Sequence, residues 1–327
     1  MSSPRVVVLG GTGSVGRQVC AAFAGHGWDV LAVARSAAPH LAGFPFAALD
    51  VTAAEPRRLA ALFTEPRADA VVNAAGGWGD TAEEMTYSHI RLVDRLVEAL
   101  ALTPHRPRLV HVGSVHEYGP VPYGTLLRED TAPRPVTPYA KTKLATSRAV
   151  LAGAGRGLDA VVLRAANMSG PHPPKESFLA ALMLRVERAL AAGEVLELSV
   201  ADARRDFIDV RDVAAAIVRA ATAPLDDRVV NLGRGEAVPI GSLVDWLIEA
   251  SGFPRDRVEL LDREVRSKGG DWTRLDIGLA RRALSWEPRI GLRESVRAMW
   301  QAAGSTAGPA AGSAAESAAG SATARTA

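Results

Sequence analysis

Near its start the chain reads Val6-Val7-Val8-Leu9-Gly10-Gly11-Thr12-Gly13-Ser14-Val15-Gly16, and this segment predicts the fold. The four apolar residues indicate a buried strand, and the glycines end it at once. The segment 17–24 that follows has the apolar spacing of a helix. A glycine-rich turn between a strand and a helix allows the backbone to approach a pyrophosphate at the helix N-terminus. We therefore predict that a dinucleotide binds to Gly10, Gly11, Thr12, Gly13, Ser14, Val15 and Gly16.

Similar β-branched runs recur through the first half of the chain. They lie at 30–33, 70–72, 109–112 and 160–163, and segments with helical spacing separate them. This alternation predicts a parallel sheet, and continuous apolar strands are typical of a sheet covered by helices on both faces. The runs alone also allow a barrel. The glycine-rich turn after the first run favours an α/β doubly wound parallel sheet, the Rossmann fold.

The strand pattern is interrupted in the second half of the chain. We expect a dinucleotide-binding domain over 1–170, to which residues 206–232 return, and a smaller, interleaved C-terminal substrate-binding lobe over 171–300. Residues 301–327 consist mainly of Ala, Gly, Ser and Thr, which lack the apolar groups needed to offset ordering entropy. We therefore predict a flexible tail there.

Composition excludes several classes of partner. The net charge of +2 comes from 38 basic and 36 acidic residues without a polybasic block, so we expect no nucleic acid partner. No signal-peptide core or membrane-spanning stretch is present, so we expect no membrane partner. The single cysteine, Cys20, allows neither a disulfide framework nor a thiolate metal site within one chain, and we assign it to core packing. A cytoplasmic location is expected.

One acidic cluster deserves comparison with a metal site. Asp206, Asp209 and Asp212 stand close together, but Arg205 and Arg211 lie among them. We interpret them as ion pairs at a domain junction, and we predict no metal.

The residues after the second apolar run predict which dinucleotide binds. NAD sites place an acid about 20 residues past the glycines to bind the ribose 2′-hydroxyl, whereas NADP sites use an Arg for the 2′-phosphate. This chain has Ala34, Arg35 and Ser36 there, without a carboxylate. A 2′-phosphate would meet a guanidinium and a hydroxyl, so we predict NADP(H).

Tyr139 and Lys143 are the candidate catalytic pair. They stand four residues apart, which places them on one face of a helix that Pro138 is suited to begin. A tyrosine titrates near ~10, so it needs a neighbouring cation to exchange protons near neutrality. We expect Lys143 to supply that charge and to bind the nicotinamide ribose.

With these features the chain resembles the extended short-chain dehydrogenase/reductases, the NAD-dependent epimerase/dehydratase group that acts mainly on nucleotide sugars. The resemblance runs from Val6 to about Trp300. The motifs that carry it are GGTGSVG at Gly10, LDV at Leu49, NAAG at Asn73, VGSVHEYG at Val112, PYAKTK at Pro138, LRAANMSGP at Leu163, RRDFIDVRDVA at Arg204 and ARRALSWEP at Ala280.

The resemblance implies roles for the residues that match. Tyr139 is implied as the acid/base, Lys143 as its partner, and Ser114 as the hydroxyl that binds the reacting oxygen. The implied cofactor contacts are Asp50 and Val51 beside the adenine, and Asn73, Ala74, Ala75 and Gly76 at a strand end. The implied diphosphate ligands are Asn167 and Arg205, with Lys268 where many relatives have an Arg. His89 stands where many relatives have an Asn.

Departures from the family pattern favour one reaction. Dehydratases follow the Ser or Thr with an Asp-Glu pair, where this chain has Val115 and His116, so dehydration lacks its acid. The family's 4-epimerases retain NAD, which Arg35 fits poorly. We therefore expect hydride transfer from NADPH to a ketone of a nucleotide-linked sugar, with Tyr139 protonating the oxygen and Ser114 steadying it. The expected enzyme is a dTDP-4-keto-6-deoxyhexose 4-ketoreductase of a secondary-metabolite pathway.

Two alternatives stay open at this stage. His116 and His172 occupy positions where bifunctional epimerase-reductases of the family carry a Cys and a His, so they allow an epimerase as well as plain substrate binding. A non-catalytic NADP(H) sensor is the remaining reading, although such proteins usually lose the Tyr and Lys. By resemblance we also expect a homodimer.

Overall fold

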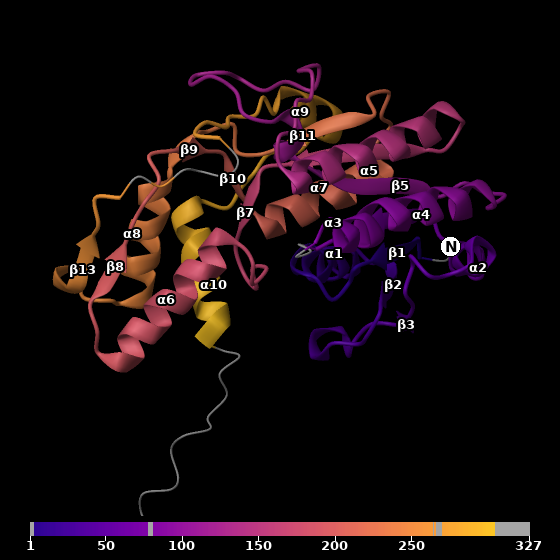
Figure 1. Cartoon of the computed structure of the whole chain (residues 1–327). Helices are drawn as coiled ribbons and strands as arrows, with labels where there is room; N and C mark the ends of the chain where they lie inside the picture. The colour runs from indigo at the N-terminus through magenta and orange to yellow at the C-terminus, as the bar shows by residue number, and fades with distance from the viewer. Residues whose placement is uncertain (1–2, 78–80, 264, 266–269, 305–327) are drawn as a thin grey trace, which may run out of the picture.

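The computed structural model describes residues 3–77, 81–263, 265 and 270–304, and its centre is one parallel sheet (Figure 1). The seven strands lie in the order β11-β6-β5-β4-β1-β2-β3, so the sheet has two edges and is not a barrel. The doubly wound α/β fold predicted from the sequence is confirmed. The strands are β1 (Arg5–Leu9), β2 (Asp29–Ala34), β3 (Phe46–Ala48), β4 (Ala70–Asn73), β5 (Arg108–Ser114), β6 (Ala160–Ala165) and β11 (Val229–Leu232).

Helices cover both faces of this sheet. One face carries α1 (Ser14–Gly25) and α7 (Val210–Thr222), and the other carries α2 (Pro56–Thr64), α4 (Leu92–Ala101) and α5 (Pro138–Gly155). Strand β1 supplies both cores, because successive side chains point to opposite faces. Val6 and Val8 pack in the first core, and Val7 and Leu9 in the second. Cys20 is buried in the first core, which confirms its assignment to packing.

All five apolar runs identified in the sequence are strands of this sheet, and two further strands complete it. Strand β3 is a three-residue edge strand of partly exposed side chains, too short for a period to be recognised. Strand β11 pairs with β6 in parallel, and α7 packs on α1. These two elements therefore bring part of the second half of the chain back to the main sheet.

A third apolar cluster lies beside the sheet (Figure 1) and is built from α6 (Phe178–Ala192), α8 (Ile240–Ser251) and α10 (Leu292–Gly304). Short paired strands accompany these helices and connect them to the main domain. The pairs are β7 (Asn167–Ser169) with β10 (Phe207–Asp209), β9 (Arg204–Arg205) with β12 (Val238–Pro239), and β8 (Leu196–Leu198) with β13 (Val258–Leu260). These helices lie in the segment 171–300 that the sequence predicts as a separate lobe.

Two expected boundaries differ from the structure. Residues 301–304 belong to α10 and not to a tail, while 305–327 lie outside the described residues. Leu275, α9 (Gly278–Leu284) and Trp286 pack in the first core of the sheet, although we expected this segment in the lobe. Apolar spacing indicates that a face is buried, but it does not indicate which core buries it.

The remaining elements are short. They are α3 (Ala82–Met85), a π-helical stretch (Thr86–Arg91) and 3-10 turns at Pro39–Leu41, Val115–Tyr118 and Arg255–Arg257. None of the helices in the described ranges is long and apolar enough to cross a membrane.

Asp206 is a fully buried carboxylate between β9 and β10. It accepts hydrogen bonds from the backbone N–H groups of Arg234 (2.8 Å), Gly235 (3.0 Å) and Leu275 (3.2 Å). Burial raises the pKa of this carboxyl to about 6. One side chain therefore satisfies three backbone donors from two separate segments.

The ion-pair interpretation of the acidic cluster is correct for one of its three members. Asp209 pairs with Arg211 at 2.8 Å. Asp212, like Asp206, instead accepts backbone N–H groups, here from Arg289 and Ile290. The sequence shows neighbouring charges, whereas these backbone donors come from loops distant in the chain.

We predict that Asp206→Ala destabilises the protein by about 3 kcal/mol or more, because it leaves buried backbone donors unsatisfied. The free energy of unfolding in urea measures this. Asp226→Ala removes an exposed carboxylate and is the matched control, with an expected effect within about 0.5 kcal/mol. Equal effects of the two substitutions would contradict the assignment.

Candidate active site

The glycine-rich turn packs against the residues that follow β4 and against the first turn of α1. Gly10 has φ +81°, and a Cβ there would lie 2.7 Å from the backbone N of Ala75. A Cβ on Gly16 would lie 2.0 Å from the carbonyl O of Gly10. Helix α1 begins at Ser14 with neither a side-chain cap nor an acid in its first turn among the described residues. The first turn of α1 thus offers backbone N–H groups without a side-chain cap, and this cradle fits a dinucleotide diphosphate.

The residues expected at the adenosine end lie after β2 and β3. Arg35 and Ser36 are exposed at the end of β2. Asp50 accepts a hydrogen bond from the hydroxyl of Tyr87 at 3.1 Å and from the backbone N–H of Thr52 at 2.9 Å. The neighbouring Val51 is buried. Tyr87 was not among the site residues predicted from the sequence.

Two histidines contact the residues at the end of β4. Asn73 accepts the backbone N–H of Ala75 (3.1 Å) and donates to Nδ1 of His111 (3.1 Å). His89 lies so close to Gly76 that a Cβ on the glycine would be 2.6 Å from its ring. Burial lowers the pKa of His89 to about 4, so the neutral ring donates Nε2–H to the Gly77 carbonyl at 2.7 Å. His89 therefore shapes the strand end as a neutral donor.

Ser114 and Tyr139 meet at the carboxyl end of the sheet. Helix α5 begins at Pro138, as predicted, and Thr137 caps it by accepting the N–H of Ala140 at 3.2 Å. This start places Tyr139 where its side chain hydrogen-bonds that of Ser114. Burial raises the pKa of Tyr139 to about 12, and the Ser114 hydrogen bond opposes this only in part. Tyr139 therefore holds its proton at neutral pH.

Lys143 lies one turn further along α5 and is 6% exposed. Its Nζ donates to the carbonyl O of Val112 at 2.6 Å, and burial lowers its pKa to about 8. The sequence predicts that Lys143 lowers the pKa of Tyr139. In this structure the desolvation of the phenol outweighs the interactions that lower its pKa, and the influence of Lys143 on Tyr139 stays a prediction.

The candidate substrate residues form a group near His116, whose ring lies close to Tyr139. The His116 ring lies 6.1 Å from the Tyr139 ring, hydrogen-bonds Asn167 and experiences the charge of Arg205. Burial is the main reason that its pKa falls to about 4. Arg205 donates to the carbonyl O of Gly270 at 2.7 Å. The structure thus brings three of the expected substrate residues together, while Lys268 lies outside the described residues.

His172 has a different set of neighbours. The backbone of His172 has φ +58°. The pKa of its imidazole is lowered by burial and by the charges of Arg17 and His40. His40 in turn contacts the carbonyl O of Gly11 at 3.2 Å. His172 is therefore placed toward the glycine-rich turn, and the structure does not show the paired action of His116 and His172 that a bifunctional epimerase needs.

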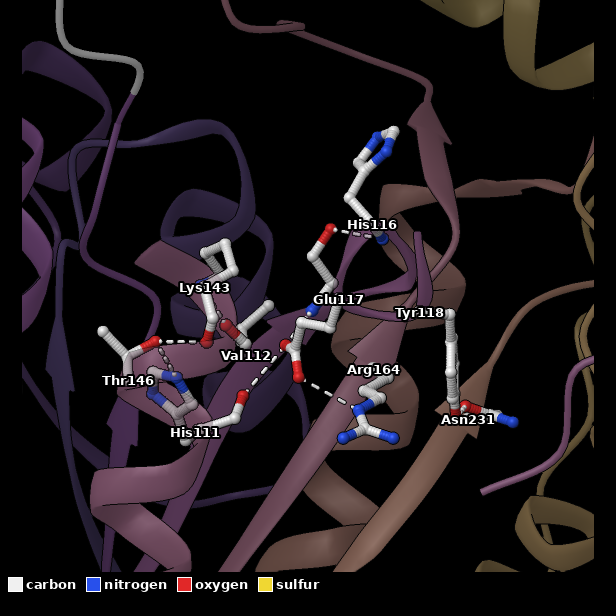
Figure 2. Close-up of polar contacts among 11 residues, drawn as sticks. His111, Val112, His116, Glu117, Tyr118, Lys143, Thr146, Arg164 and Asn231 are labelled. Carbon is white, nitrogen blue, oxygen red and sulfur yellow. Dashed lines mark hydrogen bonds and ion pairs between the residues drawn. The ribbon is translucent and has the colours of Figure 1, made fainter. Parts of the chain in front are cut away.

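A buried network of polar side chains next to Ser114 was not predicted from the sequence. Figure 2 shows Glu117 between Lys143 on one side and Arg164 on the other, with Tyr118 and Asn231 beyond. Glu117 pairs with Arg164 at 3.0 Å, and the Tyr118 hydroxyl donates to Asn231 at 2.7 Å. The Ser-x-x-Glu spacing of Ser114 and Glu117 is a capping-box signature that would have indicated part of this network.

A glycine-rich cradle and a Ser, Tyr and Lys group at the carboxyl ends of one parallel sheet define a nicotinamide-dependent enzyme of the short-chain dehydrogenase/reductase class. Residues 6–233 match the model of the NAD dependent epimerase/dehydratase family. The chain belongs to this family, as its motifs predicted.

Individual relatives cover nearly the whole chain. The dTDP-6-deoxy-L-talose 4-dehydrogenase (NAD(P)(+)) of Kitasatospora kifunensis is 41% identical over 302 residues, which are 91% of this chain and 95% of the relative. The GDP-6-deoxy-D-mannose reductase of Pseudomonas aeruginosa is 28% identical over 259 residues, 75% of this chain and 83% of the relative. The structure of MoeE5 with UDP-glucose and NAD is 26% identical, with a TM-score of 0.78 over 92% of this chain and 99% of MoeE5.

We predict that Gly16→Ala abolishes dinucleotide binding and destabilises the protein by at least about 1–3 kcal/mol, because the new Cβ overlaps the Gly10 carbonyl. Calorimetric titration with NADPH and thermal unfolding measure the two effects. Gly25→Ala, at the other end of α1, meets nothing within 4 Å and is the control. A variant of Gly16 that binds NADPH normally would show that the turn is not the cradle.

Proposed function

We propose that this enzyme is an NADPH-dependent ketoreductase that acts on carbon 4 of a dTDP-linked 4-keto-6-deoxyhexose in a secondary-metabolite pathway. The observation that carries the proposal is the hydrogen bond between Ser114 and a Tyr139 that retains its proton. The name of the 41% identical relative supports the substrate, since it specifies a dTDP-linked 6-deoxy sugar and its 4-position. Oxidation of a 4-hydroxyl is the reverse of the proposed reduction.

The chain's own residues account for the proton. Tyr139 donates its proton to the ketone oxygen as that oxygen gains charge, and Ser114 donates a hydrogen bond to the same oxygen. Bound NADPH supplies the hydride that the carbonyl carbon receives. The tyrosinate left behind is stabilised by the Lys143 ammonium until solvent returns the proton. The net change is addition of one hydride and one proton to the C=O bond.

The residues after Ser114 argue against loss of water. Val115 is buried and apolar, and it stands where a dehydratase needs a carboxylic acid. His116 is neutral above about pH 4, and its imidazole is engaged with Asn167. Neither side chain supplies the acid that a leaving hydroxyl requires.

We assign substrate binding to the group near His116. Arg205 and Asn167 supply a charge and an amide for the diphosphate, with Lys268 added by resemblance. His116 and His172 remain candidates for contacts with sugar hydroxyls. Because Arg205 belongs to β9 and Asn167 to β7, the diphosphate would be held between the main sheet and the third cluster.

Replacement of Arg35 should change cofactor choice. The wild type is expected to prefer NADPH over NADH, and Arg35→Asp should raise the KM for NADPH about tenfold or more while improving use of NADH, because it repels the 2′-phosphate. Initial rates with each cofactor measure this. Ser36→Ala, which removes only a hydroxyl, should have a smaller effect. A wild type that prefers NADH would refute the cofactor assignment.

The function itself is tested by NADPH oxidation against a panel of nucleotide-linked 4-ketosugars. We expect turnover with a dTDP-4-keto-6-deoxyhexose, and Tyr139→Phe should reduce kcat by about 10²–10⁴ without loss of NADPH binding. Tyr123→Phe removes a hydroxyl from a side chain that is 71% exposed and should leave kcat unchanged. Turnover by Tyr139→Phe at the wild-type rate would exclude Tyr139 as the proton donor.

A further inference from the structure

Glu117 is a fully buried carboxylate, and Figure 2 shows it between Lys143 and Arg164. It lies in the 3-10 turn that follows β5. Its Oε1 accepts the backbone N–H of Ser114 at 2.8 Å and the hydroxyl of Ser147 at 2.9 Å. Its Oε2 accepts Nε–H of Arg164 at 3.0 Å. One carboxylate thus ties together the end of β5, helix α5 and strand β6.

The capping box does not require a charge at this position. A capping box needs only an acceptor, which a glutamine supplies equally well. A buried carboxylate and guanidinium both lose their hydration, and such a pair seldom stabilises a fold more than apolar groups of the same shape. The Arg164 guanidinium also stacks on the Tyr118 ring at 4.6 Å, so both charges are enclosed by protein. Neither the capping box nor packing therefore explains why residue 117 carries a negative charge.

That charge acts on Lys143. Burial disfavours the Lys143 ammonium, and the Glu117 carboxylate opposes this effect. His111 on β5 and His89 beside the β4 end also face Lys143, but burial and the lysine charge lower the pKa of both rings. His111 is locked as a neutral ring, because it accepts from Asn73 and donates to Thr146 at 3.3 Å. Among the described groups that influence Lys143, Glu117 supplies the negative charge, and the same charge raises the pKa of Tyr139.

We propose that Glu117 is a positioning residue of the catalytic centre: its Oε1 fixes the backbone N–H of Ser114, and its place between Lys143 and Arg164 makes it the counter-charge of the Lys143 ammonium (Figure 2). Arg164 holds the carboxylate in this place from the opposite side. The inference rests on the proposed function for the roles of Ser114 and Lys143. In that reaction the ammonium is the group that stabilises the tyrosinate, so Glu117 acts through Lys143 and does not touch the substrate.

The test is an NMR titration of the full-length chain labelled with ¹³C-lysine. Glu117→Gln keeps the shape and the acceptor oxygen but removes the charge, so the titration midpoint of Lys143 should fall by about one pH unit, a tenfold change in the ratio of ammonium to amine. Ser147→Ala removes one hydrogen bond to the same oxygen but keeps the charge, and it should leave the midpoint unchanged. Lys143→Met assigns the signal among the four lysines, Lys141, Lys143, Lys175 and Lys268.

An unchanged midpoint in Glu117→Gln, or an equal shift in Ser147→Ala, overturns the proposal. If Glu117→Gln fails to fold because Arg164 is left unpaired, the double variant Glu117→Gln/Arg164→Gln removes both charges, and the midpoint should still fall. The titration needs no substrate, so it stands even if the wild type oxidises no NADPH with any ketosugar. Where a substrate is found, the alkaline limb of the kcat profile should move to lower pH in Glu117→Gln and stay in place in Ser147→Ala.

Discussion

The contact between Gly16 and the carbonyl of Gly10 is the constraint on which the rest of this molecule depends. Because no Cβ fits between them, helix α1 can start directly against the turn that follows β1. The same turn packs on the end of β4 through Gly10 and Ala75. The helix N-terminus therefore lies at the carboxyl end of β1, on the same edge of the sheet as the candidate catalytic side chains.

Burial shapes the chemistry of these side chains more than their mutual charges do. Tyr139 keeps its proton and Lys143 loses its proton more easily than in water, both mainly through desolvation. The two histidines nearest to the Tyr139 ring, His89 and His116, are neutral for the same reason. The site thus combines a poised proton donor with a lysine whose charge depends on its surroundings, which is why a buried carboxylate beside it matters.

Much of this could be predicted from the sequence, because local patterns carry it. Strand β1, the glycine turn and the start of α5 at Pro138 each follow from the types and spacing of neighbouring residues. Glu117 and Arg164 could not be paired in this way, since they stand 47 residues apart and meet only when β5 and β6 align. The sequence predicts an ion pair for Asp206, but its partners are backbone N–H groups of distant loops. Charges are visible in a sequence, whereas burial and backbone donors become visible only in the fold.

The short parallel pair of β7 and β10 has a consequence for recognition. Asn167 pairs in register with Phe207, and the amide of Asn167 also donates to the carbonyl O of Asp206 at 3.1 Å. The groups that we propose for the diphosphate therefore sit on backbone that is already cross-linked by hydrogen bonds before any ligand arrives. Little ordering entropy remains to be lost there on binding. Discrimination among sugars should then depend on the side chains around the sugar ring, while the contribution of the nucleotide to the affinity stays nearly constant from one substrate to another.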